Sequence, residues 1–152
     1  MARCEAKRVN IVTLKMVKEA SFLYGQRQIN SPLDAADMLK PFLAEEDRET
    51  FIVLCLDTKN QPTSLQTVSI GSLNCTLVHP REIFKLAILS NANALILSHN
   101  HPSGDSTPSR EDIEITKRLQ QAGELLGIEV LDHIILTSEG YCSLKEQALI
   151  DS

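Results

Sequence analysis

The chain has 152 residues, of which 43% are hydrophobic, and both figures suit one domain with a single hydrophobic core. Its formal net charge is -5 at pH 7 and no face of clustered lysines and arginines is evident, which argues against a broad nucleic-acid surface. No apolar stretch approaches the roughly 18 residues of a membrane span, and no charged leader precedes an apolar segment, so we expect a cytoplasmic protein without membrane contact.

Residues 1–30 are expected to form an N-terminal strand or extension. Apolar residues alternate loosely over residues 9–17, which favours a strand that leads into a turn at Gly25. Ser31 and Pro32 then predict a helix start, with Ser as the N-cap and Pro at the first helical position. This helix is expected to bend or end near Pro41. The residues that mark one of its faces are Leu33, Ala36, Leu39 and Phe42.

Two apolar segments in the middle of the chain predict a β-hairpin. Residues 51–56 and 65–70 favour strands, and the turn-rich residues 57–62 join them. A helix is then expected to begin at His79 and Pro80, where His79 is interpreted as a cap rather than a metal ligand. The apolar residues of this helix are Ile83, Leu86, Ala87 and Leu89.

The C-terminal half continues the alternation of strands and helices. A buried strand is predicted at residues 94–98, and a second one at residues 128–137, closed by a turn and a short last strand at 141–144. Between them, a helix from Ser109 to Gly127 is expected to bury Ile113, Ile115, Leu119, Leu125 and Leu126. The mixture suits an α+β fold, with a mainly antiparallel sheet and helices packed against it.

The four cysteines predict neither a disulfide framework nor a thiolate metal site. They are widely separated, and no Cys-x-x-Cys pair occurs. We therefore expect reduced cysteines that pack as small apolar side chains. The four are Cys4, Cys55, Cys75 and Cys142.

The sequence His99-Asn100-His101-Pro102 carries the clearest chemical signal. Its two imidazoles are two residues apart where the apolar run 94–97 ends, so both can leave the end of a strand on the same face. Asp112, in the first turn of the following helix, can supply a carboxylate as a third ligand. Two histidines and one carboxylate leave a fourth tetrahedral position for water, which distinguishes a catalytic zinc site from a closed structural one.

Ser109 and Asp112 have a second interpretation. Their spacing fits a helix N-cap with its capping-box partner, and this alone would explain both residues. The two interpretations are compatible, because a serine hydroxyl accepts one hydrogen bond while it donates another. Both therefore stay open from the sequence.

His-x-His-Pro followed by Ser-x-x-Asp, with ten residues between the second His and the Asp, resembles the JAMM metalloprotease motif of the MPN-type (Mov34/JAB) domain. More narrowly, residues 99–105, 112–119 and 132–135 resemble the RadC family of bacterial proteins. The resemblance implies that residues 31–152 form a RadC-like JAMM (MPN) domain of cytidine-deaminase-like architecture. Longer RadC proteins begin with a helical, DNA-binding-like segment, so this chain is expected to be a short, single-domain member.

The resemblance also implies a function for particular residues. His99, His101 and Asp112 would hold Zn²⁺, and the protein would cleave an amide or isopeptide bond through metal-activated water. Glu49 would act as general base and then acid, because the family's catalytic glutamate lies directly before the strand that begins the core hairpin. Ser109 would direct its hydroxyl to the developing oxyanion.

Alternatives remain at several of these positions. By physical chemistry alone Glu45, Glu46 and Glu49 are each equally compatible with a solvated surface charge, and only the family pattern selects Glu49. His133 belongs to the family pattern, and we expect a hydrogen-bonded core group rather than a fourth ligand there.

The function as a whole also has alternatives. One is a non-catalytic DNA-repair or protein-interaction module, and another is metal-dependent hydrolysis of a different bond, such as a phosphodiester. An intact ligand set argues against a pure scaffold. The expected partner is an unidentified protein or peptide substrate, and the sequence is compatible with a homo-oligomer.

Overall fold

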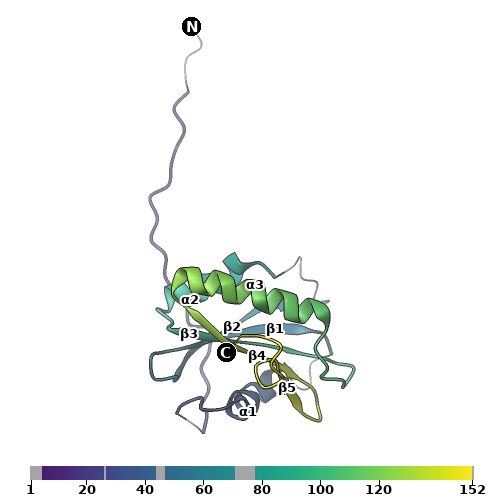
Figure 1. The fold of residues 1–152 in the computed structure, drawn as a ribbon. Coiled ribbons are helices and arrows are strands. Elements are labelled where there is room, and N and C mark those ends of the chain that lie inside the picture. The colour runs from purple at the N-terminus through teal and green to yellow at the C-terminus, as the bar shows by residue number, and fades with distance from the viewer. Residues whose placement is uncertain (1–4, 26, 44–46, 71–77, 152) are drawn as a thin grey trace.

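The computed structural model describes residues 5–25, 27–43, 47–70 and 78–151, and this part of the chain forms three helices and a five-stranded sheet (Figure 1). In chain order the elements are α1 (Pro32–Leu43), β1 (Thr50–Leu56), β2 (Pro62–Ile70), α2 (Pro80–Leu89), β3 (Ala94–Asn100), α3 (Arg110–Leu126), β4 (Glu129–Leu136) and β5 (Tyr141–Ser143). None of the described helices is long and apolar enough to cross a membrane.

The sheet has the strand order β2-β1-β3-β4-β5. The predicted hairpin of β1 and β2 is confirmed, and β1 also pairs antiparallel with β3, as β4 does with β5. Only the pair β3 and β4 is parallel among the described strands, because α3 carries the chain back across the sheet between them. The predicted α+β fold with a mainly antiparallel sheet is therefore confirmed. This crossover places the start of α3 beside the C-terminal end of β3, at one edge of the sheet, where the candidate site lies.

Helices cover both faces of the sheet. Side chains alternate along β1, so that Phe51, Val53 and Cys55 pack with α2 and α3, whereas Ile52, Leu54 and Leu56 pack with α1 (Figure 1). Because both faces are covered, every residue of β1 and β3 is buried. Leu95 and Leu97 of β3 face α2 and α3, and the same alternation directs His99 to that face.

Two predicted helix faces were partly wrong. Leu33 of α1 is 51% exposed, because the buried stripe of that helix runs through Ala35, Ala36, Leu39 and Leu43. In α3, Leu125 and Leu126 are 89% and 49% exposed. The buried stripe of α3 runs through Ile115, Leu119 and Gly123, and Leu125 lies off this stripe. Leu126 is in phase with the stripe, three residues after Gly123, but it is the last residue of the helix. The helix stops at Gly127, as predicted, and Gly127 itself adopts the left-handed conformation (φ 72°).

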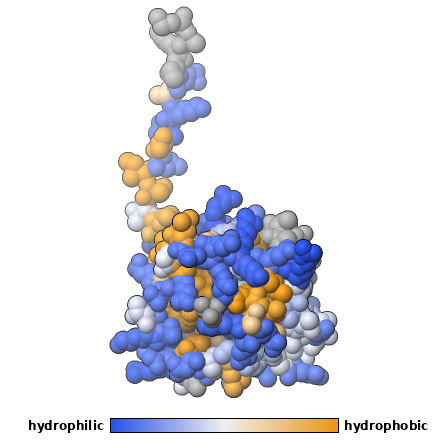
Figure 2. Space-filling model, in the orientation of Figure 1, coloured by the Kyte–Doolittle hydropathy of each residue, from blue (hydrophilic) through white to orange (hydrophobic). Residues whose placement is uncertain are grey.

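The predicted N-terminal strand over residues 9–17 was wrong. Residues 5–25 contain no strand and extend from the domain as an exposed segment, in which apolar and polar residues alternate loosely (Figures 1 and 2). Val9 is 89% exposed, since nothing in the described sheet pairs with this segment and alternation alone does not supply a partner. At its base, the ring of Phe22 contacts Phe42 of α1 at a centroid distance of 4.7 Å.

The described cysteines behave as predicted. Cys55 is buried in β1 and Cys142 is half-buried in β5, and both are free thiols. Burial raises the pKa of Cys55 to about 11, although a hydrogen bond with Ser90 opposes this. Cys4 and Cys75 lie outside the described residues.

Candidate metal centre

The structure brings together the three side chains that the sequence predicted as metal ligands. His99 is the second-to-last residue of β3, His101 directly follows that strand, and Asp112 lies in the first turn of α3. The Nε2 atoms of the two histidines are 2.9 Å apart. Asp112 Oδ1 lies 3.3 Å from His99 Nε2, and its Oδ2 lies 3.4 Å from His101 Nε2. The three residues thus present their donor atoms to one point.

These distances fit a tetrahedral metal ion. With zinc–nitrogen and zinc–oxygen distances of about 2.0–2.1 Å, two ligand atoms of a regular tetrahedron are roughly 3.3 Å apart. The two Nε2 atoms are 2.9 Å apart, and each lies 3.3 or 3.4 Å from a different oxygen of Asp112, so each pair of donor atoms is within tenths of an ångström of that value. The donor set of two imidazoles and one carboxylate leaves a fourth position open, as in catalytic zinc sites.

Asp112 also belongs to a helix cap. Its backbone N–H donates to Ser109 Oγ (3.0 Å), and its carboxylate Oδ2 accepts from the Ser109 backbone N–H (2.8 Å), which completes a capping box. The capping interpretation of this pair is therefore confirmed. It does not exclude the metal-ligand role, because both carboxylate oxygens still face the histidines.

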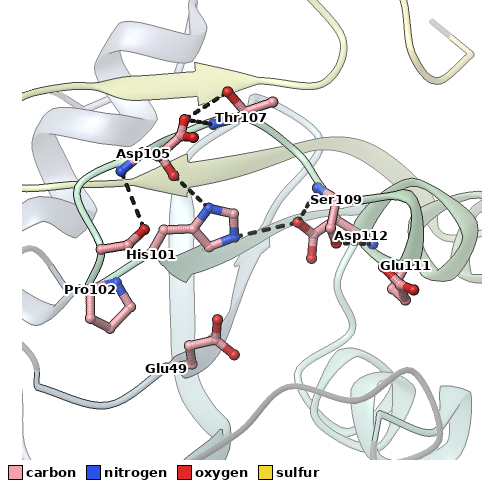
Figure 3. Close-up of a pocket in the computed structure, with 9 residues that line it drawn as sticks. Glu49, His101, Pro102, Asp105, Thr107, Ser109, Glu111 and Asp112 are labelled. Carbon is pink, nitrogen blue, oxygen red and sulfur yellow. Dashed lines mark hydrogen bonds and ion pairs between the residues drawn. The ribbon is translucent and has the colours of Figure 1, made fainter.

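His101 is oriented by the loop that joins β3 to α3. Its Nδ1 lies 2.8 Å from the backbone oxygen of Asp105 (Figure 3). A carbonyl oxygen can only accept, so Nδ1 carries a proton; in the neutral ring Nε2 is then without a proton, whereas in the protonated ring Nε2 donates to Asp112. The hydrogen bond with Asp112 raises the pKa of His101 against the effect of burial. Burial acts to raise the pKa of Asp112, but hydrogen bonds with His101 and His99 outweigh it and leave that pKa well below its usual range. The ionised Asp112 carboxylate therefore favours a cation between the two histidines.

A group of buried side chains lies behind His99. The ring of Phe51 stacks on His99 at a centroid distance of 6.1 Å, and His133 Nε2 lies 2.6 Å from His99 Nδ1. His133 Nδ1 in turn lies 2.6 Å from Thr116 Oγ1. His133 is therefore a hydrogen-bonded core group, as expected, and burial, followed by the charge of His99, lowers its pKa well below the ordinary value. Sequence reasoning missed Thr116. The available signal was its position four residues after Asp112, on the same face of the helix.

A cavity of about 450 Å³ opens beside His101 and Asp112. Glu49 lies across it from His101, with its carboxylate directed towards the side of the cavity that His101 and Asp112 form (Figure 3). The antiparallel register explains this position, since Phe51 pairs with His99 and two further residues bring Glu49 opposite His101. Glu45 and Glu46 lie outside the described residues. The described residues that line the cavity are Glu49, His101, Pro102, Ser103, Asp105, Thr107, Ser109, Glu111 and Asp112.

Asn100 fixes the backbone on both sides of Glu49. Its Oδ1 accepts from the backbone N–H of Thr50 (2.7 Å), and its Nδ2 donates to the backbone oxygen of Arg48 (3.0 Å). Asn100 is only 2% exposed. The residue between the two histidines thus ties the segment that carries Glu49 to the end of β3. Sequence reasoning missed this role, for which the position between the histidines was the only signal.

His79 does not join the site. It occupies the N-cap position of α2, as expected. Its side chain, however, makes no capping hydrogen bond. The start of the helix relies instead on Pro80 at its first position.

A mixed sheet whose central strand ends in His-x-His, facing a carboxylate in the following helix, is the arrangement of a JAB/MPN-type domain. Residues 29–149 match the family described as the RadC-like JAB domain, and the chain therefore belongs to the RadC family.

Similar proteins include a UPF0758 protein of Methanosarcina barkeri, 50% identical over 125 residues, which cover 82% of this chain and 55% of that protein. A UPF0758 protein of Desulfitobacterium hafniense is 54% identical over 122 residues, covering 80% of this chain and 54% of the relative. One from Moorella thermoacetica is 50% identical over 131 residues, with 86% and 57% covered. The chain spans about half the length of these curated relatives. Their names identify no reaction.

Proposed function

We propose that this chain is a zinc-dependent hydrolase of the JAMM type, which cleaves an amide or isopeptide bond in a protein or peptide. The observation that carries the proposal is the convergence of three metal-ligating side chains at near-tetrahedral distances beside a cavity that Glu49 also lines. A binding module would have no need of an open metal position with a carboxylate facing it. The proposed zinc ligands are His99, His101 and Asp112.

The donor set supports zinc as the metal, because imidazole and carboxylate with an open fourth position are typical of its catalytic sites. A zinc ion bound there would lower the pKa of a coordinated water from about 15.7 to about 7 and polarise a substrate carbonyl. Glu49 would accept the proton of the attacking water and later deliver it to the leaving amine. Ser109 would support the oxyanion, since the bond that its Oγ accepts from Asp112 leaves its own proton to donate.

The charge of the cavity supports an amide substrate over a phosphodiester. Four carboxylates, from Glu49, Asp105, Glu111 and Asp112, line it, and no lysine or arginine is among its described lining residues. An anionic phosphodiester would meet repulsion there, whereas phosphoryl-transfer sites place cationic clamps on the substrate. A neutral or cationic peptide segment suits this lining better.

The test begins with metal analysis of the purified protein, which should contain close to one zinc per chain. A peptide and isopeptide library then identifies a cleavable substrate. Glu49→Gln keeps the size and hydrogen bonding of the side chain but cannot accept a proton, so turnover should fall by roughly 10² to 10⁴-fold while zinc content persists.

Glu114→Gln is the matched control, because Glu114 is an exposed glutamate of α3 that pairs with Arg110 and does not line the cavity. It should leave turnover unchanged. Full activity in Glu49→Gln would contradict the assigned base. If zinc-loaded protein cleaves nothing across a broad panel, the hydrolase proposal fails and an interaction module becomes the better explanation.

A further inference from the structure

Three fully buried side chains form a continuous hydrogen-bonded row behind the proposed metal position. Thr116 of α3, His133 of β4 and His99 of β3 are each 0% exposed. Thr116 Oγ1 lies 2.6 Å from His133 Nδ1, and His133 Nε2 lies 2.6 Å from His99 Nδ1. Each ring nitrogen of His133 therefore has one partner, and each partner comes from a different element of the fold.

The direction of every bond in this row follows from Thr116. Its hydroxyl donates its single proton to the backbone oxygen of Asp112, at 2.6 Å. It can then only accept from His133, so His133 carries its proton on Nδ1. Because His133 is fully buried and its ring partners are a hydroxyl and an imidazole, the neutral ring is favoured and its Nε2 is bare. His99 must therefore donate from Nδ1, which leaves its own Nε2 without a proton.

The result is an arrangement that calls for a cation. The loop carbonyl of Asp105 gives His101 the same form, with its proton on Nδ1 and a bare Nε2. Two nitrogen lone pairs thus face each other at 2.9 Å, next to the Asp112 carboxylate. If His99 carried its proton on Nε2 instead, it would simply donate to His101 and block the metal position. The row from Thr116 selects the form that can bind metal.

We infer that Thr116 and His133 are positioning residues that hold His99 in its metal-binding tautomer and thereby set the affinity of the site for its metal. This inference rests on the metal site proposed above. Neither residue touches the metal, and their effect passes entirely through His99. Groups that orient a metal-ligating histidine in this way typically change metal affinity by about 10 to 100-fold when they are removed.

The first measurement is zinc affinity, by competition with a chromophoric chelator near neutral pH. Thr116→Val keeps the branched shape but removes the hydroxyl, so zinc should bind about 10 to 100-fold more weakly. Thr116→Ser restores the hydroxyl and should bind zinc almost as tightly as the unmodified protein. Ile115→Val is the matched packing control, since Ile115 is the neighbouring buried residue of α3 and makes no side-chain hydrogen bond. Equal losses in Thr116→Val and Ile115→Val would overturn the inference.

The second measurement is independent of zinc. In the metal-free protein labelled with ¹⁵N-histidine, long-range nitrogen–proton NMR correlations report which ring nitrogen carries the proton. We expect His99 and His133 to carry it on Nδ1, and Thr116→Val to shift protons towards Nε2. A proton on His99 Nε2 in the unmodified protein would overturn the inference even if Thr116→Val failed to fold. Absence of zinc binding together with the expected tautomers would instead contradict the proposed function and the effect on zinc affinity, while the tautomer assignment would stand.

Discussion

Asn100 offers a sharp test of how the fold positions the proposed base. Asn100→Ala removes the acceptor of the Thr50 N–H and the donor to the Arg48 carbonyl, two bonds that span 50 and 52 residues of sequence. Thr50 is only 6% exposed, so its N–H would be left buried without that partner, at a cost of about 1–3 kcal/mol. Arg48 is exposed, and its carbonyl can be satisfied by water at little cost.

Summed, these effects should lower the free energy of unfolding by about 1–3 kcal/mol. For a domain of this size each 1 kcal/mol corresponds to roughly 2–4 °C in Tm, so a fall of several degrees is expected in thermal denaturation. Hydrogen exchange at the Thr50 amide should also accelerate, because local opening of the segment around Glu49 becomes easier. Turnover should decrease while zinc content stays the same.

Ser98→Ala serves as the control for this experiment. Ser98 is equally buried in β3, and its hydroxyl donates to the Ile134 carbonyl at 2.7 Å, away from Glu49. Its loss should cost about 1 kcal/mol without a specific effect on the Thr50 amide. If Asn100→Ala were no less stable than Ser98→Ala, and the Thr50 amide exchanged equally slowly in both, the reasoning about this residue would be refuted.

Three further predictions concern other parts of the molecule. Gly123→Ala would place its Cβ 2.2 Å from the carbonyl oxygen of Ile128, a backbone atom, so Tm should fall by several degrees even though alanine favours helices; an unchanged Tm would contradict this close approach. Cys55, whose pKa burial raises to about 11, should resist iodoacetamide in the folded protein and react only in denaturant, as mass spectrometry will show; rapid alkylation under native conditions would contradict its burial. Asp112→Ala should lose zinc and about 1 kcal/mol of helix capping, whereas Asp112→Asn should retain most of the stability and still bind zinc poorly, which unfolding curves and metal analysis can separate.

The elements of the fold that the sequence predicted well are those with local signals. The hairpin at residues 50–70 and the helix between Ser109 and Gly127 are specified by turn residues, caps and periodicity within a few positions. The strand expected at residues 9–17 failed because a strand requires a pairing partner, and no local pattern states whether one exists. Leu125 was misplaced because apolar character alone does not fix which side of a helix faces the sheet, and Leu126 because it does not show where along the helix the contact with the sheet ends.

The same distinction separates the parts of the site. His99, His101 and Asp112 were predictable because they lie within one strand, loop and helix, at spacings that the motif fixes. Thr116 meets His133 from 17 residues away, and Asn100 meets Thr50 from 50 residues away. Contacts of this kind arise only when the crossover and the sheet register are formed. The orienting roles of Thr116 and Asn100 were therefore visible only in the structure.

Asp112 shows how closely the local fold and the proposed chemistry depend on each other. Its Oδ2 accepts the Ser109 N–H at the start of α3, where the helix dipole also favours a negative charge. These effects and the two histidines keep the carboxylate ionised, which a metal ligand must be. Its backbone oxygen accepts the proton of Thr116, which sets the direction of the row that ends at His99. Asp112 thus completes the helix cap, offers one proposed ligand and, through the following turn, orients a second one, so the proposed metal site depends on a correct start of α3.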